Sequence, residues 1–262
     1  MKKLTLFFLI LFTCKGIAQL PAKLDSLMPE YEKLKEDTLK VEKFLFVATQ
    51  LATIDTTLSG KYGRRAYSLA LKINDIKGIG NSYNYFGTRY YYVQDYNNGI
   101  NCFEKAASYF SQCKYLKGSA SSLNNCGAIY TEKGEFDKAI EYQKKSLIIN
   151  QQLKNNDAIA GNYLNIGNVY NLKGDYKIAM SNLLKAEPIY QKVQNWEGLA
   201  TTYYNIAYVL YNMKQYDKAI EYCENQGLKR ITLLTDEDPK VMTFYKRHGF
   251  KKSPMIPLRM IF

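Results

Sequence analysis

Histidine is almost missing from this sequence, which contains a single one, His248. Ser-His-Asp catalysis and His-based metal binding are therefore close to excluded, because each needs imidazole groups at defined places beside other reactive side chains. The chain also lacks a C-x-x-C pair, and none of its apolar runs approaches the roughly 20 residues that a transmembrane helix needs. We therefore expect no catalytic residue, no metal site, no cofactor and no transmembrane segment.

Cysteine is scarce, with five residues in the chain. Cys126 and Cys223 take positions that core apolar residues normally fill, so the four cysteines after Cys14 are interpreted as small buried thiols. Cys102 and Cys113 are too far apart along one helix to bridge each other. A bridge between Cys113 and Cys126 is the alternative to consider if the protein is exported.

Positive charge is in excess, with a net charge of +12, but it is unevenly placed. Residues 227–262 hold eight Lys and Arg against three acids, and the chain from residue 19 to 226 is close to balanced. A nucleic-acid-binding protein would carry a basic stripe along its main body. We therefore expect no nucleic-acid partner.

The N-terminus has the pattern of a secretory signal peptide. Two lysines precede a nine-residue run, Leu4 to Phe12, that is apolar except for Thr5, and the segment Gly16-Ile17-Ala18 follows as a cleavage site. This pattern predicts cleavage after Ala18, so residues 1–18 are assigned as a signal peptide and the mature chain as periplasmic or secreted. A lipoprotein anchored through Cys14 is the alternative, but Thr13 before it is bulkier than the usual Gly, Ala or Ser.

What the chain does have is an internal repeat with a period of forty residues. The residues that keep this spacing are Gly127 and Gly167, Tyr130 and Tyr170, Gly134 and Gly174, and Ala139, Ala179 and Ala219. Such a period predicts stacked units of two helices joined by a tight turn. Gly134 and Gly174 fall between the two helices, where a residue must adopt a left-handed conformation to end the first.

These residues give the chain a resemblance to the tetratricopeptide repeat family in a forty-residue form. The resemblance covers residues 40–226, about five repeats of which the first is degenerate, after a leading helix at residues 19–39. It implies a right-handed superhelix of helix-turn-helix units whose concave groove is lined by the first helix of each unit. With its signal peptide, the chain also resembles the periplasmic tetratricopeptide regions of bacterial sensor kinases. Binding of a partner, and no enzymatic activity, is what this family implies.

The C-terminal residues 227–262 follow a different pattern. A short β-type run precedes a helix that ends at Gly249, and a second apolar run follows, which predicts a β-α-β tail. Phe244, Tyr245 and His248 make this tail resemble the C-terminal segment of the GNAT acetyltransferases, in which Tyr245 would act as general acid. The repeats upstream hold no strand followed by a Gly-rich turn for acetyl-CoA. Two alternatives to an acetyltransferase are that the tail comes from a gene fusion or frame-joining event, or that it caps the last repeat.

The candidate binding residues form a column of amides along the first helices. Placing the repeats in phase aligns Tyr85, Asn125, Asn165 and Asn205, and the neighbouring positions hold Asn84, Asn124, Asn168, Tyr204 and Tyr208. An Asn side chain offers one acceptor and two donors, so it can bind the N–H and C=O groups of an extended peptide. The alternative is that these amides bond neighbouring helices and stabilise the stack.

The sequence therefore predicts an all-α protein with a short β-α-β tail. It predicts an exported scaffold that binds a peptide or protein in a concave groove, in signalling or complex assembly. An N-acetyltransferase activity of the tail and an adaptor that works through its convex face are the alternatives. The sequence does not define the oligomeric state.

Overall fold

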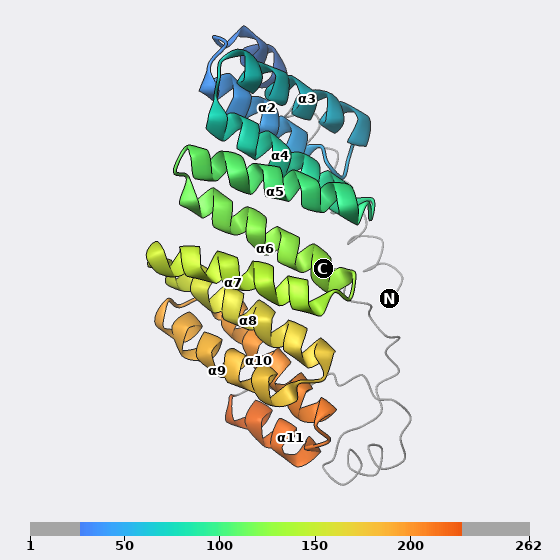
Figure 1. Ribbon diagram of the computed structural model, residues 1–262, viewed down its shortest axis with the longest axis vertical. Coiled ribbons are helices and arrows are strands. Elements are labelled where there is room, and N and C mark those ends of the chain that lie inside the picture. Colours follow the sequence, from blue (N-terminus) through green and yellow to red (C-terminus); the bar gives the residue numbers. More distant parts are fainter. Residues whose placement is uncertain (1–26, 227–262) are drawn as a thin grey trace, which may run out of the picture. The chain divides into compact units, whose positions relative to one another are not determined.

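The structure is a computed structural model that describes residues 27–226, and all of its regular elements are helices. A helical segment over residues 27–33 precedes the numbered helices (Figure 1). These are α2 (Thr38–Gln50), α3 (Thr56–Lys72), α4 (Ile76–Tyr92), α5 (Tyr96–Gln112), α6 (Leu116–Glu132), α7 (Phe136–Gln152), α8 (Asn156–Lys173), α9 (Tyr176–Lys192), α10 (Trp196–Asn212) and α11 (Tyr216–Asn225). The chain divides into two compact units, Met1–Val209 and Leu210–Phe262.

The repeat of forty residues is built from two half-periods of twenty. Helices α3 to α11 begin twenty residues apart in the sequence, and a residue with positive φ lies in each turn between consecutive helices. These turn residues are Asn74, Gln94, Lys114, Gly134, Lys154, Gly174, Gln194 and Lys214. The left-handed conformation predicted for Gly134 and Gly174 is confirmed, with φ of 71° and 88°.

Side-chain caps fix where many of the helices begin. The carboxylates of Asp55, Asp75 and Asp95 each accept a hydrogen bond from a backbone N–H in the first turn of the following helix. Asn155 caps α8 in the same way, and Asn195 accepts from the N–H of Gly198 at 2.9 Å. These short polar residues satisfy N–H groups that have no partner inside the helix.

Within the first unit, each helix from α2 to α8 packs against its successor, and α2 with α4 and α4 with α6 also make contact. A small residue on the first helix of a pair faces a larger side chain on the second. Gly87 faces Phe103, Gly127 faces Gln143 and Gly167 faces Leu183. These contacts explain the period of the small residues, because a Cβ at any of the three would lie within 3 Å of its neighbour.

The predicted fold class needs a correction. No strand occurs in residues 27–226, so the structure supports an all-α fold and not an α fold with a β part. The β-type runs of the predicted β-α-β tail were placed in residues 227–262, which lie outside the described residues, as does Tyr245. The leading helix predicted for residues 19–39 ends at residue 33, and the non-helical residues 34–37 separate it from α2.

The three described cysteines, Cys102, Cys113 and Cys126, are free, so no bridge joins Cys113 to Cys126. Burial raises the pKa of the Cys126 thiol to about 12, and its side chain is fully buried, whereas Cys113 is exposed. At pH 8 an alkylating reagent should therefore modify Cys113 readily and Cys126 only when the chain unfolds, because the thiolate is the reactive form. Mass spectrometry of the two peptides over time checks this, and equal rates would contradict it.

Candidate functional site

The predicted binding residues all lie on the first helices of successive pairs, α4, α6, α8 and α10. We call this set of nine side chains the first-helix face: Asn84, Tyr85, Asn124, Asn125, Asn165, Asn168, Tyr204, Asn205 and Tyr208. None of the nine is charged. The structure divides them into residues that bond neighbouring helices, one that enters the core, and others that are partly exposed.

Three of the asparagines join neighbouring first helices. Asn165 on α8 donates to the side-chain oxygen of Asn124 on α6 at 2.9 Å. Asn84 on α4 accepts from the hydroxyl of Ser122 on α6 at 2.8 Å. For these three amides the structure shows the bonds of the stacking alternative, in which the side chain bridges helices of adjacent pairs.

Tyr85 lies in the core and is only 8 % exposed. Its ring fills the space beside Gly63 on α3, and its hydroxyl is 2.7 Å from the hydroxyl of Ser59. The guanidinium of Arg89 also donates to this hydroxyl at 3.1 Å. Because protein atoms surround both its ring and its hydroxyl, Tyr85 packs α4 against α3 and is not available to a ligand.

The remaining amides keep their hydrogen-bonding capacity. Asn125, Asn168 and Asn205 are partly buried, and within residues 27–226 their side chains form no hydrogen bond. Each therefore offers one acceptor and two donors to a ligand. They come from α6, α8 and α10; Asn125 and Asn205 occupy the same repeat position, and Asn168 lies three residues, about one helical turn, beyond that position on α8.

Two tyrosines lie beside these amides on α10. The rings of Tyr204 and Tyr208 are stacked, with centroids 6.2 Å apart and an angle of 5° between planes, and their side chains are 45 % and 40 % exposed. Partial burial raises the pKa of the Tyr204 hydroxyl above its ordinary value, so it is neutral at physiological pH. The pair gives a flat surface that loses little side-chain entropy on binding.

Sequence reasoning missed a buried amide network behind this face. Gln143 on α7 donates to the backbone oxygen of Asn124 at 3.2 Å and accepts from Asn162 on α8 at 3.0 Å. Asn162 in turn accepts from Asn150 at 2.8 Å. Gln143 and Asn162 are 1 % and 2 % exposed. The sequence contained one signal for this network. Phe103, Gln143 and Leu183 occupy the same repeat position, and Gln143 is the polar one of the three.

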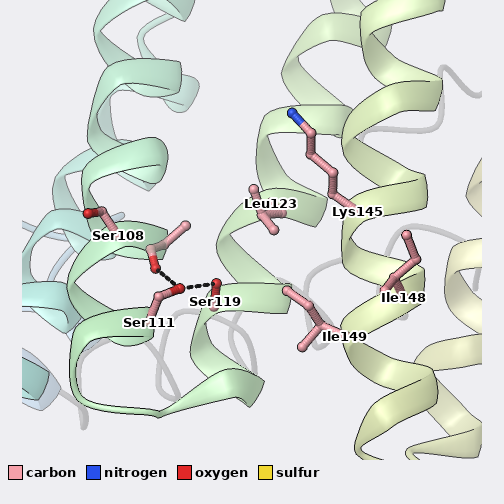
Figure 2. A pocket seen from close by; sticks show the side chains of 8 residues that line it. Ser108, Ser111, Ser119, Leu123, Lys145, Ile148 and Ile149 are labelled. Carbon is pink, nitrogen blue, oxygen red and sulfur yellow. Dashed lines mark hydrogen bonds between the residues drawn. The ribbon is translucent and has the colours of Figure 1, made fainter.

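A separate cavity of about 400 Å³ lies among α5, α6 and α7 (Figure 2). Its lining residues are Ala107, Ser108, Ser111, Ser119, Leu123, Lys145, Ile148 and Ile149. The hydroxyls of Ser111 and Ser119 are 3.2 Å apart and form a hydrogen bond. Figure 2 marks this bond with a dashed line and shows the two serines next to each other on one side of the cavity. None of the nine residues of the first-helix face lines this cavity.

The described part of the chain holds no group of three or more His, Cys, Asp or Glu that could bind a metal ion. Among the same residues, no helix is both long and apolar enough to cross a bilayer. The chemistry available to the first-helix face is therefore hydrogen bonding and aromatic contact.

Comparisons with known structures show the same fold in several proteins. The apo form of RapI is 21% identical over 71% of this chain and 68% of its own, with a TM-score of 0.64. BtubC (BKLC) from P. vanneervenii is 17% identical over 95% of this chain and 97% of its own, with a TM-score of 0.67. A Rap protein complexed with competence and sporulation factor is 18% identical over 77% of this chain and 56% of its own, with a TM-score of 0.61.

A comparison with curated protein sequences gives no match. Family models described as tetratricopeptide repeat match residues 78–152, 118–192 and 200–225. These matches cover most of the helices of the structure and more than half of the chain. The chain therefore belongs to the tetratricopeptide-repeat proteins.

Proposed function

We propose that this protein binds an extended, uncharged peptide segment of a partner along the first-helix face. The observation that carries the proposal is the set of unbonded amides of Asn125, Asn168 and Asn205, which recur on α6, α8 and α10. A peptide in an extended conformation presents N–H and C=O groups along its length, and an amide side chain can bind both. The stacked Tyr204 and Tyr208 provide an apolar contact for one of its side chains.

The chemistry of the face favours a neutral ligand. Its nine residues carry no formal charge, although the chain as a whole carries +12. Arg89, the cation near the face, already donates to Tyr85 and to the backbone oxygen of Thr56. Binding should therefore depend little on salt, since screening acts on charged groups.

One structural neighbour supports a ligand-binding role for the fold. It is the Rap protein complexed with competence and sporulation factor. The proposal for the present chain is a scaffold that binds its partner at equilibrium and takes part in signalling or complex assembly. We propose further that the protein acts outside the cytoplasm, as the signal-peptide pattern of residues 1–18 predicts.

The test uses the triple variant N125A/N168A/N205A and a phage-displayed library of random peptides. Peptides selected on the unmodified protein should be poor in charged residues, and the triple variant should bind them at least ~10-fold more weakly, since each neutral hydrogen bond contributes about 0.5–1.5 kcal/mol. Fluorescence anisotropy in low and high salt measures both effects. The melting temperature should be unchanged, because these amides bond nothing in the described structure.

The matched control is N101A/Q151A/Q191A, which removes three exposed amides from the second helices α5, α7 and α9. This variant should bind the selected peptides as the unmodified protein does. Undiminished binding by N125A/N168A/N205A, or equal loss in both variants, would show that the peptide does not lie on the first-helix face.

A further inference from the structure

Positive charge is concentrated on one face of α3. Lys61, Arg64, Arg65 and Lys72 occupy four positions of this helix. One period later, the same positions of α5 hold Asn101, Glu104, Lys105 and Gln112, so the four cations become one cation and one acid. The repeat itself therefore does not require four cations at these positions, and α5 does not share them.

A cavity of about 420 Å³ opens on this face. Its lining residues are Glu36, Lys40, Phe44, Lys61, Arg64, Arg65, Ser68, Leu69 and Lys72. Five of the nine are cationic and one is acidic. We call this cavity the basic pocket; it is formed by α2, α3 and the turn before α2. Its volume is within the range of small-molecule sites.

Lys40 contributes a buried positive charge to the wall of the basic pocket, and among the described residues no carboxylate forms an ion pair with it. This lysine is only 8 % exposed, and its ammonium donates to the backbone oxygens of Glu32 at 2.7 Å and Leu34 at 3.1 Å. Carbonyl groups satisfy two of its three donors but carry no net charge to offset it. Their own hydrogen-bonded partners lower the pKa values of the Glu32 and Glu36 carboxyls most, and the charge of Lys40 lowers them further through space. Neither carboxylate forms an ion pair with Lys40.

Carboxylates balance only two of the other cations. Glu32 forms a two-point ion pair with Arg65, which lowers the pKa of the Glu32 carboxyl, and Glu36 pairs with Lys72. In residues 27–226, Lys61 forms no ion pair. The basic pocket is therefore left with an excess of positive charge after its internal pairs are counted.

The floor of the basic pocket is apolar. Phe44 and Leu69 are only 2 % and 8 % exposed. Cations cover the Phe44 ring: the guanidinium of Arg65 lies 4.5 Å from its centroid and the ammonium of Lys40 lies 5.7 Å from it. A ligand therefore reaches this part of the floor only when the Arg65 side chain moves aside. A cavity with an apolar floor and a cationic rim suits a ligand that has both an anionic group and an apolar part.

We propose that the basic pocket binds a phosphate group carried on a small apolar molecule, with the phosphate at Lys40 and Lys61 and the apolar part against Phe44 and Leu69. This site is independent of the first-helix face. Phosphate is favoured over a carboxylate because its several oxygens and double charge can accept from more than one cation at once. The phosphate could reach the site free or as a lipid headgroup, and the experiment separates these sources.

The test measures binding to the full chain by isothermal titration calorimetry with three probes. These are inorganic phosphate, monomeric dihexanoyl phosphatidic acid, and dihexanoylglycerol, which is the same lipid without phosphate. We expect the phosphatidic acid to bind, with an affinity that falls as salt is raised, and dihexanoylglycerol not to bind. Inorganic phosphate binding as tightly as the lipid would identify free phosphate as the ligand and would overturn the part of the proposal that places an apolar group against Phe44 and Leu69.

The variant Ser68→Asp introduces a negative charge among the pocket residues without removing a packed group, because Ser68 is exposed. It should weaken binding of the phosphatidic acid at least ~10-fold, because a like charge opposes the phosphate. The matched control is Ser108→Asp, at the equivalent position of α5, which should leave binding unchanged. Absence of binding by both phosphate probes, equal binding of dihexanoylglycerol, or an unaltered affinity in Ser68→Asp would overturn the proposal.

Discussion

Replacing Gly63 by alanine is expected to lower the free energy of unfolding of the first unit by about 1–3 kcal/mol, since overpacking costs ~1–3 kcal/mol, a displaced buried hydrogen bond adds about 1, and the higher helix propensity of alanine returns about 1. A Cβ at this position would lie 2.0 Å from Cε1 of Tyr85 and 2.7 Å from its Cδ1. The ring cannot turn aside without losing its hydroxyl contacts with Ser59 and Arg89. The gain in helix propensity from Gly to Ala, about 1 kcal/mol, offsets only part of this cost.

Urea unfolding followed by circular dichroism measures the effect of Gly63→Ala, and hydrogen exchange locates it. Exchange should increase first in α3 and α4, because neighbouring repeats unfold as partly separate units. Gly161→Ala is the control: its Cβ would meet only the hydroxyl of Tyr190 at 3.4 Å, so this variant should be as stable as the unmodified protein or more so. A Gly63→Ala protein that matched Gly161→Ala in stability would show that the ring of Tyr85 is not fixed.

Tyr85 also shows what the repeat pattern could and could not predict. Alignment in phase places it in one column with Asn125, Asn165 and Asn205, and this placement on a first helix is what the structure has. Whether the Tyr85 side chain points into the core or toward solvent depends on Gly63, a residue of another helix, α3. Gly63 stands forty residues before Phe103, where the next pair has a large ring, and the space left by this glycine is filled by Tyr85.

The turns give a second example. Gly134 and Gly174 could be predicted to be left-handed because glycine adopts this conformation without strain. Lys114, Lys154 and other non-glycine residues adopt it too, with φ of 57° and 52°. Residue preferences alone argue against lysine there, since a left-handed non-glycine residue costs about 1–2 kcal/mol. The packing of the helices on both sides of each turn imposes the left-handed conformation. In the sequence, the recurrence of these turns every twenty residues is the feature that indicates it.

Alignment of the repeats could not predict which asparagines form hydrogen bonds with each other. Asn124 and Asn165 are bonded although they are 41 residues apart, so the contact runs diagonally between adjacent first helices. Which amides pair and which stay available to a ligand depends on the small offset between helices. The repeat fixes the face on which these amides lie, but that offset comes only from the packed structure.

Replacing Asn162 by serine is expected to lower the free energy of unfolding by about 2 kcal/mol, because each buried group left without a partner costs ~1–3 kcal/mol. Ser82 and Ser122 occupy the equivalent position in the two preceding repeats, so serine is compatible with the helix at position 162. It removes the donor to Gln143 and the acceptor of Asn150, both of which are buried. Urea unfolding measures the loss, and Asn182→Ser, in a partly exposed site on α9, is the control.

A double-mutant cycle with Gln143→Leu separates the lost bond from general damage to the core. Leucine is the residue at the equivalent position of the next pair, Leu183, where it packs against Gly167 as Gln143 packs against Gly127. If the network is the cause, Q143L/N162S should be more stable than the sum of the two single losses predicts, by at least ~1 kcal/mol, because both unsatisfied groups are removed together. Strictly additive losses would mean that the two amides stabilise the protein through the volume they fill. The hydrogen bond between Gln143 on α7 and Asn162 on α8 would then contribute nothing to the free energy of unfolding.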